Sequence, residues 1–287
     1  MAEGWLSGAS LVSGREDLLQ FTSVVKFASY NTFAGKMEWH RRDLSTNFAE
    51  FSSVNGLAGA LKGSSSRTTF GGFFETAFAS SSTHDDGPLG ISRTRTLGIG
   101  AFGTIEFRQM ELEKSQLEGA FRVGALHNSW EGEGPIFSHT FRGSVPYCAV
   151  RLGTLYGRQW RGKFPVYLYA RYFWAYQAGK NFPDRAISFG AINSHRIRVG
   201  GRFAGRTPKR LVPWCDAYYE REFAATVKGS ADGEEIPRFS LKGDRAGCNL
   251  GFTYQPLPAL TADLSLQGSV DAKRKSLAAC LCMGREF

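Results

Sequence analysis

Side chains that commonly carry catalysis are few in this sequence, and none of them has a patterned partner. The histidines are His40, His84, His127, His139 and His195. His84 is followed by Asp85 and Asp86, a combination that could serve a hydrolase site on a loop. No nucleophile accompanies this triplet, however, and the Ser, Thr, Gly and Pro residues around it are typical of a turn. We therefore expect a solvated turn and no catalytic residue.

The cysteines argue against metal and redox chemistry as well. There are five, at positions 148, 215, 248, 280 and 282. An odd number without the spacing of metal ligands is unlike a disulfide framework or a zinc site. Cys280 and Cys282 share one face of a strand and could meet an oxidant, but the simpler interpretation is that both fill space as small side chains. We expect neither a metal nor a cofactor.

Charged residues, by contrast, follow a regular pattern. Arg196, Arg198 and Arg202 alternate with apolar residues, so they share one face of a strand. The next alternating segment, 211–223, carries acidic residues on one face in the same way, and consecutive antiparallel strands would bring the two sets together. Its acidic residues are Asp216, Glu220 and Glu222. Charged residues on the polar face of other segments are Glu118, Arg122, Arg171 and Asp263.

The elements that must position these charges are alternating segments, and the sequence contains many of them. In the second half they cover residues 166–174, 195–203, 211–223, 248–256 and 260–270. In the first half they cover residues 32–41, 54–62, 69–80, 93–107, 117–126 and 147–156. The polar stretch 130–135 between two of them predicts a loop. Glycine, with 34 residues, and aromatic residues, at 14%, accompany these segments, which favours an all-β barrel over an α/β enzyme.

One face of each clear segment is apolar and the other is polar or charged, which fits two kinds of barrel. A soluble barrel would turn the apolar face inward, whereas a membrane barrel turns it outward around a wet lumen. Segments of about ten residues favour the membrane, because a tilted spanning strand needs about 9–11 residues and globular strands average about 5–6. We expect lipid contact for the following residues: Val199, Phe252, Leu260, Leu264 and Leu266.

Bulk properties agree with a membrane barrel without proving it. The mean hydropathy of −0.25 would suit a soluble protein, and no run of 18 apolar residues predicts a membrane helix. In a membrane barrel, however, the apolar exterior and the polar lumen cancel in such an average. The net charge of +9 would permit nucleic-acid binding, but Lys and Arg are spread along the chain and no recognition motif accompanies them, so we expect no such partner.

The two ends of the sequence differ in character. Residues 276–287 alternate between a face with Leu277, Leu281, Met283 and Phe287 and a face of small or polar residues, which predicts a final strand whose edge must be paired. Residues 3–19 fit helical spacing in part, although glycines weaken the pattern. The start lacks a signal peptide, so we expect either an upstream start or an excised domain.

Taken in order, several of these segments resemble the C-terminal β-domain, or translocator, of the type V autotransporters of Gram-negative bacteria. Residues 6–19 resemble the helix that precedes the barrel of that family. Segments resembling successive strands of the family are G-G-F-F-E at 71–75, L-E-G-A-F-R-V-G at 117–124, V-Y-L-Y-A-R-Y-F-W at 166–174, R-I-R-V-G-G-R-F at 196–203 and Y-Y-E-R-E-F at 218–223. The resemblance covers about residues 4–287.

The resemblance implies an all-β fold: a twelve-stranded antiparallel transmembrane β-barrel with an N-terminal helix in its lumen. Residues 1–26 would form the linker and pore helix, and residues 27–287 the outer-membrane barrel. The pore helix would contain Leu6, Gly8, Ala9, Leu11, Asp17 and Leu18. The signal for barrel assembly would be Phe287, Met283 and Leu281.

The implied function is that of a translocator in the bacterial outer membrane, a monomer that supports export of an N-terminal passenger. Its partners would be the outer-membrane lipid, the assembly machinery and the passenger, which is missing from this chain. Arg285 departs from the family because an aromatic residue is usual there, and at an interface it must snorkel. The helix also lacks the Asn at which some members are cut, so self-cleavage is not implied.

Three other functions compete with this interpretation. The first is a passive porin-like pore in which the helix is a plug, marked by large conductance without a passenger. The second is an outer-membrane enzyme, which a peptide or ester hydrolysis assay would reveal. The third is a soluble ligand-binding barrel, which would not need detergent for extraction.

Overall fold

The computed structural model describes residues 27–41, 45–63, 66–84, 89–110, 113–133, 138–160, 164–183, 186–205, 210–231, 233–257, 260–272 and 274–286. Among these residues no helix is long and apolar enough to cross a membrane. The pore-helix residues expected within 1–26, and Phe287, lie outside the described part of the chain. The strands are β1 (Phe27–Arg41), β2 (Ser45–Lys62), β3 (Ser66–His84), β4 (Leu89–Met110), β5 (Glu113–Glu133), β6 (Ser138–Trp160), β7 (Phe164–Gln177), β8 (Lys180–Phe182), β9 (Ile187–Phe189), β10 (Ile192–Ala204), β11 (Leu211–Glu222), β12 (Thr226–Ala231), β13 (Glu234–Ser240), β14 (Gly243–Leu257), β15 (Leu260–Asp271) and β16 (Arg274–Glu286).

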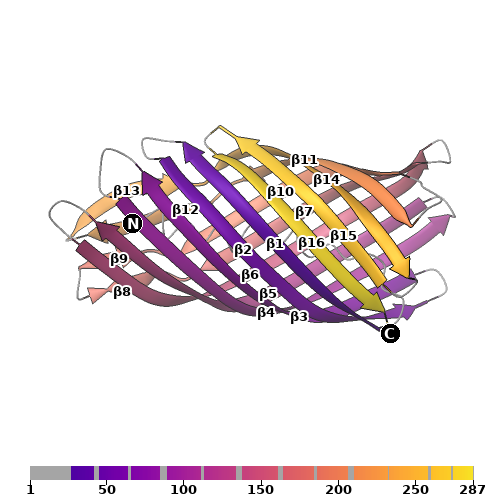
Figure 1. The fold of residues 1–287 in the computed structure, drawn as a ribbon, viewed down its shortest axis with the longest axis horizontal. Coiled ribbons are helices and arrows are strands. Elements are labelled where there is room, and N and C mark those ends of the chain that lie inside the picture. The colour runs from indigo at the N-terminus through magenta and orange to yellow at the C-terminus, as the bar shows by residue number, and fades with distance from the viewer. Residues whose placement is uncertain are drawn as a thin grey trace.

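Twelve of these strands form one closed barrel in which sequence neighbours pair side by side (Figure 1). Every pairing is antiparallel, and the barrel closes where β1 pairs with β16 from Ala28 opposite Glu286 to His40 opposite Arg274. The expectation that the last strand must be paired, and that the chain forms a twelve-stranded antiparallel barrel, is therefore confirmed. Closure leaves none of the twelve barrel strands with an unpaired edge, which is the condition for a sheet that contacts lipid.

The alternation of side chains assigns the apolar face to the outside of the barrel. Leu250 and Leu266, which are directly opposed on β14 and β15, are 60% and 58% exposed. Arg198 and Glu220, on the other face of β10 and β11, are only 4% and 2% exposed. The outward residues at the middle of the strands form what we call the apolar belt. Its members include Leu57, Phe74, Leu97, Ile99, Phe121, Val123, Leu152, Leu168, Val199, Leu250, Leu264 and Leu266.

Several strands are much longer than the segments in which alternation is visible. β6 has 23 residues and continues on both sides of the predicted segment 147–156. Residues 130–133, predicted to be part of a loop, belong to β5. The difference has a simple physical reason: alternation of apolar with polar residues ends where the apolar belt ends, but backbone pairing continues into the polar zone beyond it.

The two ends of the barrel differ in their connections. At the end where β16 finishes, between two and six residues separate consecutive strands of the barrel. Figure 1 shows this end at the right, where the C-terminus is marked. At the opposite end two long connections, residues 178–191 and 223–242, carry the short strands β8, β9, β12 and β13. These four form a separate sheet in the order β13-β12-β9-β8, which we call the cap sheet. It was not predicted from the sequence, because its strands have as few as three residues.

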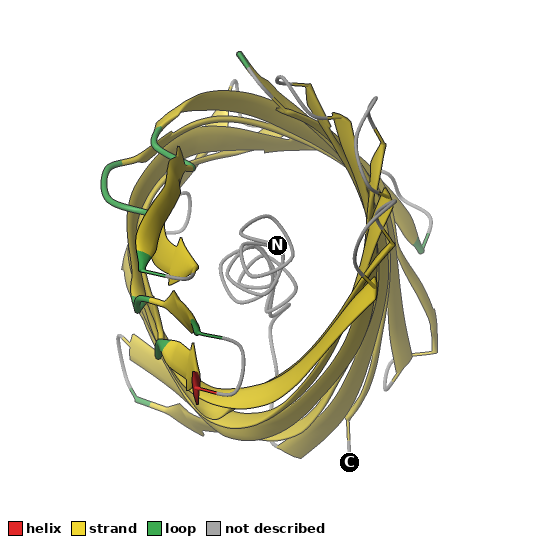
Figure 2. Ribbon diagram, turned by 90° about the vertical axis from the view of Figure 1, so that its left-hand side faces the viewer, coloured by secondary structure: helices red, strands yellow, loops and turns green. Residues whose placement is uncertain are grey.

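The cap sheet packs against the inner wall of the barrel mouth. Viewed from that end, its strands lie just inside the ring (Figure 2). Ile187, Phe189 and Val227 of the cap sheet share one buried apolar cluster with Leu126 and Val145 of β5 and β6. Burial of these side chains fixes the cap sheet to one side of the opening.

The charged inner wall

Arginines and carboxylates on β10 and β11 meet across the inner face of the barrel. The register places Arg198 directly opposite Glu220, and Arg198 donates two hydrogen bonds to one carboxylate oxygen, at 2.9 and 2.6 Å. Arg196 binds the other oxygen of Glu220 at 3.3 Å, and Arg245 of β14 lies 4.0 Å from it. Glu220 therefore neutralises charge from three arginines on the two neighbouring strands, β10 and β14. Arg202 and Asp216 form a similar pair with N and O atoms 3.7 Å apart.

Aromatic rings support the arginines of this wall. The guanidinium of Arg198 lies over Tyr218, 4.1 Å from the ring centre, and Arg202 lies over Trp214 at the same distance. The guanidinium of Arg198 also lies over the ring of Phe173 on β7, 5.3 Å from the ring centre. A guanidinium over a ring face is stabilised by the ring quadrupole, more strongly where water is excluded. The sequence predicted a wet lumen, but in the structure Arg198 and Glu220 are buried and paired with each other.

A second group of charges lies on the wall formed by β3, β5 and β6. Arg122 of β5 pairs with Glu75 of β3 at 3.1 Å, and both side chains are buried. The hydroxyl of Tyr147 on β6 donates a hydrogen bond to the same carboxylate. Farther along the barrel, Arg171 of β7 pairs with Glu118 of β5 at 2.5 Å. These contacts join strands that are not adjacent, so they brace the barrel across its inner surface.

Large inward rings lie over glycines on the neighbouring strand. Tyr218 is directly opposite Gly247, and Phe73 is directly opposite Gly100. A Cβ atom at Gly247 would overlap the ring of Tyr218. Glycine is required here for close approach, because the ring occupies the volume that any side chain would need. The same directly opposed arrangement recurs in the pairs Phe102–Gly71, Tyr147–Gly124, Tyr169–Gly200 and Trp214–Gly251.

Two carboxylates join the barrel to the cap sheet. Glu222, the last residue of β11, accepts hydrogen bonds from Ser194 Oγ at 2.5 Å and from the backbone N–H groups of Ala224 and Ala225 at 3.0 and 3.1 Å. Asp271 at the end of β15 binds Arg274 at 2.6 Å, and Arg274 in turn donates to the carbonyl oxygen of Leu241 beside the cap sheet. The long connection 223–242 is thus fixed at its start and at its end.

All the charged residues that the sequence placed on the polar face lie on the inner side of the barrel. Glu222 also lies 3.7 Å from Arg196 Nε, and Asp263 accepts a hydrogen bond from Thr253 at 2.7 Å. Sequence reasoning missed Glu75, Arg245 and Asp271, although each lies at the inward parity of its strand. Of the predicted assembly residues, Leu281 and Met283 lie on the outer face of β16, 37% and 39% exposed.

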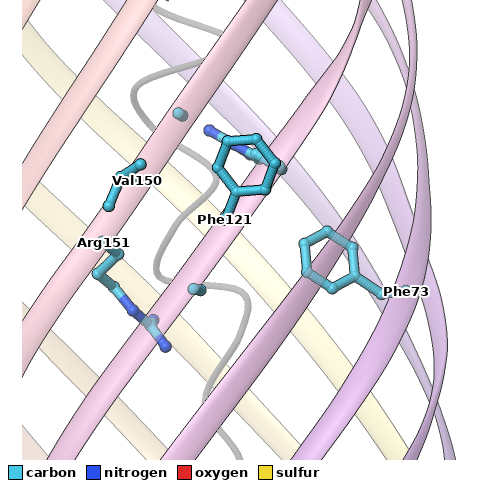
Figure 3. Close-up of a pocket in the computed structure, with 7 residues that line it drawn as sticks. Phe73, Phe121, Val150 and Arg151 are labelled. Carbon is cyan, nitrogen blue, oxygen red and sulfur yellow. The ribbon is translucent and has the colours of Figure 1, made fainter.

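Nothing among the described residues resembles an active site. No cluster of His, Cys, Asp and Glu in the described ranges could hold a metal ion, and no disulfide joins cysteines there. Asp85 and Asp86, which follow His84 at the end of β3, lie outside the residues that the structure describes. A hollow between β3, β5 and β6 is lined by inward residues such as Phe73 and Arg151 and by outward ones such as Phe121 and Val150 (Figure 3). Because it mixes both faces, it is a gap in the wall rather than a chamber for a substrate.

The fold is a single-chain closed barrel, and solved structures of outer-membrane barrels match nearly all of the chain. No family model matches the sequence, and no curated protein matches it. The transport unit of the autotransporter AIDA-I from Escherichia coli matches with a TM-score of 0.78 at 12% identity, covering 100% of this chain and 99% of that one. The β-domain of the Bordetella autotransporter BrkA matches with a TM-score of 0.78 at 12% identity, covering 92% and 100%.

An outer-membrane channel from Pseudomonas putida is similar to a lesser degree. Its TM-score is 0.61 at 11% identity, with coverage of 95% of this chain and 98% of that one. The chain therefore has the fold of an autotransporter translocator domain, and it is more similar to the two translocators than to this channel. None of these three structures is described as an enzyme.

Proposed function

We propose that this chain is a translocator barrel, which inserts in a bacterial outer membrane and supports export of a segment joined to its N-terminus. The observation that carries the proposal is the division of the barrel into an apolar exterior and a charged interior. Leu250 at 60% exposure would be costly in water but favourable in hydrocarbon, whereas the buried pairs of Arg198 and Glu220 form a polar inner wall. The full-length likeness to two translocator domains supports the same function.

The proposal includes the direction of the barrel in the membrane. In bacterial outer-membrane barrels the periplasmic turns are short and the cell-surface loops are longer. The cap-sheet end, with its long connections 178–191 and 223–242, would then face the cell surface. The end at which β16 finishes would face the periplasm.

Export is tested with a passenger of known sequence. An epitope tag is fused ahead of Glu3, behind a cleavable secretion signal, and the protein is produced in a Gram-negative bacterium. We expect antibody to bind the tag on intact cells, and external protease to remove it. A tag and signal without residues 27–287 is the control and should stay in the periplasm. A barrel that is folded in the outer membrane while its tag stays protected would contradict export.

A passive pore with a plug is the second candidate, because the Pseudomonas putida channel matches the full barrel. Conductance in planar bilayers separates the two. A translocator with its lumen occupied should conduct weakly until residues 1–26 are removed. Large conductance of the whole chain, with no effect of a fused passenger, would favour the pore.

We also propose that the barrel is a monomer and that β16 is the segment read by the barrel assembly machinery. Leu281 and Met283 face outward on that strand, where another protein can reach them before insertion. Replacing both by Asn should lower the amount of heat-modifiable barrel in outer membranes, whereas Ala278→Ser on the inner face should not. Equal amounts of barrel from all three chains would contradict this role. The contribution of Phe287 stays a prediction.

A further inference from the structure

β4, β5 and β6 carry a group of basic side chains on their outer face, toward the cap-sheet end. Arg93 and Arg95 lie on β4, His127 on β5 and Arg142 on β6, and all four side chains are exposed. We call these four residues the basic patch. They take no part in the charged inner wall, because they have the opposite parity on their strands.

The register brings the members of the basic patch close together. Arg93 is paired with Ser129, and Ser129 is paired with Arg142 on the next strand. Arg95 and His127 are directly opposed in the adjacent row. Two strand spacings separate Arg93 from Arg142, or about 10 Å. Long arginine side chains can converge on one phosphorylated group over that distance.

The charge of the patch is not compensated by the residues that the structure describes. Among the described residues no carboxylate forms an ion pair with Arg93, Arg95 or Arg142. Glu131 lies on the same outer face, but one row farther from the belt, opposite Ile91. Arg221 on the outer face of β11 is different, because Asp244 lies 3.5 Å from its guanidinium.

Directly beside the patch, the outer face turns apolar. The next rows of register contain Leu97 opposite Ala125 and Ile99 opposite Val123. Leu97 and Ile99 are 56% and 61% exposed, so they belong to the apolar belt. A ligand that suits both zones must have an anionic head and apolar chains. A soluble anion would use the first zone alone.

We propose that the basic patch binds the phosphate-bearing head group of a lipid in the leaflet at the cap-sheet end, with its acyl chains against Leu97 and Ile99. The inference rests on the membrane placement proposed above. Arginine suits this task because its planar guanidinium binds phosphate oxygens in pairs and stays charged at any physiological pH. The bound lipid would hold β4, β5 and β6 at the depth of the boundary between head groups and hydrocarbon.

The test uses the whole chain, purified as a folded barrel in a non-ionic detergent, and lipopolysaccharide as the probe. Binding is measured by native mass spectrometry and by ultracentrifugation with labelled lipopolysaccharide. Arg93→Gln and Arg142→Gln should each weaken binding about fivefold, and the double variant about twentyfold or more. Arg221→Gln is the matched control and should leave binding unchanged, because Asp244 already neutralises that arginine.

Further measurements distinguish a failure of the proposed lipid site from a failure of the proposed translocator function. Inorganic phosphate at millimolar concentration should not displace the lipid, since it lacks acyl chains; full displacement would overturn the proposal of a lipid. Equal affinities of the wild type and of the double variant would overturn the site. Heat-modifiability on gels shows that each variant is folded, and surface display of the fused tag reports export separately. Export without patch-dependent binding would leave the translocator function standing and refute the lipid site.

Discussion

Glu220 is the residue on which the inner wall depends most, because three arginines share its carboxylate. Arg198 binds it at 2.6 Å, Arg196 at 3.3 Å, and Arg245 is within 4.0 Å. Buried charges are tolerated only when they are paired, since removing one partner leaves the other desolvated without compensation. Aromatic rings lie beside two of these arginines: Arg196 is 5.2 Å from the ring centre of Phe173, and Arg198 is 4.1 Å from that of Tyr218.

Replacing Glu220 by Gln should therefore destabilise the barrel strongly. We expect the free energy of unfolding to fall by about 3–5 kcal/mol. Urea unfolding in lipid vesicles, followed by tryptophan fluorescence, measures the change. Arg221→Gln, which breaks an exposed pair, should cost less than about 1 kcal/mol. Equal effects of the two substitutions would show that the inner wall is not desolvated.

The pairing of rings with glycines gives a second prediction at this scale. A methyl group at Gly247 would push Tyr218 away from Arg198, so Gly247→Ala should destabilise by about 1–3 kcal/mol. Gly268→Ala is the matched control, because no atom lies within 4 Å of the Cβ that it would add. The same urea experiment compares them. A stable Gly247→Ala variant would mean that Tyr218 moves without cost.

At the scale of elements, the cap sheet is a unit of its own fixed to the barrel. Its apolar residues join the cluster around Leu126 and Val145, and Glu222 fixes the chain where it enters the connection 223–242. Because the barrel closes without the cap sheet, the two should lose structure separately. Local unfolding of a peripheral element is expected where its contacts are few.

Val227→Asp should release the cap sheet and leave the barrel intact, because it places a charge in the apolar cluster. Proteinase K should then cut within residues 223–242 at rates well above those of the wild type, while heat-modifiability on gels is retained. Lys228→Asp, at the exposed neighbouring position, is the control and should resist digestion. Loss of the whole barrel in Val227→Asp would show that cap and barrel form one cooperative unit.

The elements also show what the sequence could and could not reveal. Alternation predicted the strands around Arg198 and Glu220, their parity and their cross-strand pairing, because one face there is apolar and the other charged. It could not reveal the full length of β6, whose outer parts have polar residues on both faces. Nor could it reveal β8 and β9, because a strand of three residues is too short to show an alternating pattern. Glu75 was missed because its neighbours on the inner face of β3, Phe73 and Ala77, are apolar and show no pattern of charges.

For the whole molecule, the decisive feature is the height of the apolar belt along the barrel axis. Leu250 lies at the middle of the outward apolar run on β14, whereas Leu257 is the last residue of that strand. Both are well exposed, at 60% and 58%. In a membrane the two positions lie at different depths, so a charge should cost more at Leu250 than at Leu257. In water the two positions would be equivalent.

Arginine at these two positions should have different costs. We expect Leu250→Arg to destabilise by about 2–4 kcal/mol and Leu257→Arg by about 0–1 kcal/mol, because the penalty depends on depth in the bilayer. Unfolding in vesicles of defined thickness gives both values. Similar small costs at both positions would place Leu250 outside the hydrocarbon.

The contact of the outer face with lipid is tested most directly by spin labels on adjacent residues of β15. In a cysteine-free background, labels are attached at Leu266→Cys on the outer face and at Ser265→Cys on the inner face. Collisions with oxygen, which concentrates in hydrocarbon, and with a water-soluble nickel chelate are then measured in vesicles. We predict high oxygen and low nickel accessibility at 266, and a much lower ratio of oxygen to nickel accessibility at 265. The reverse order would place the leucines away from lipid and contradict both the membrane placement and the export function.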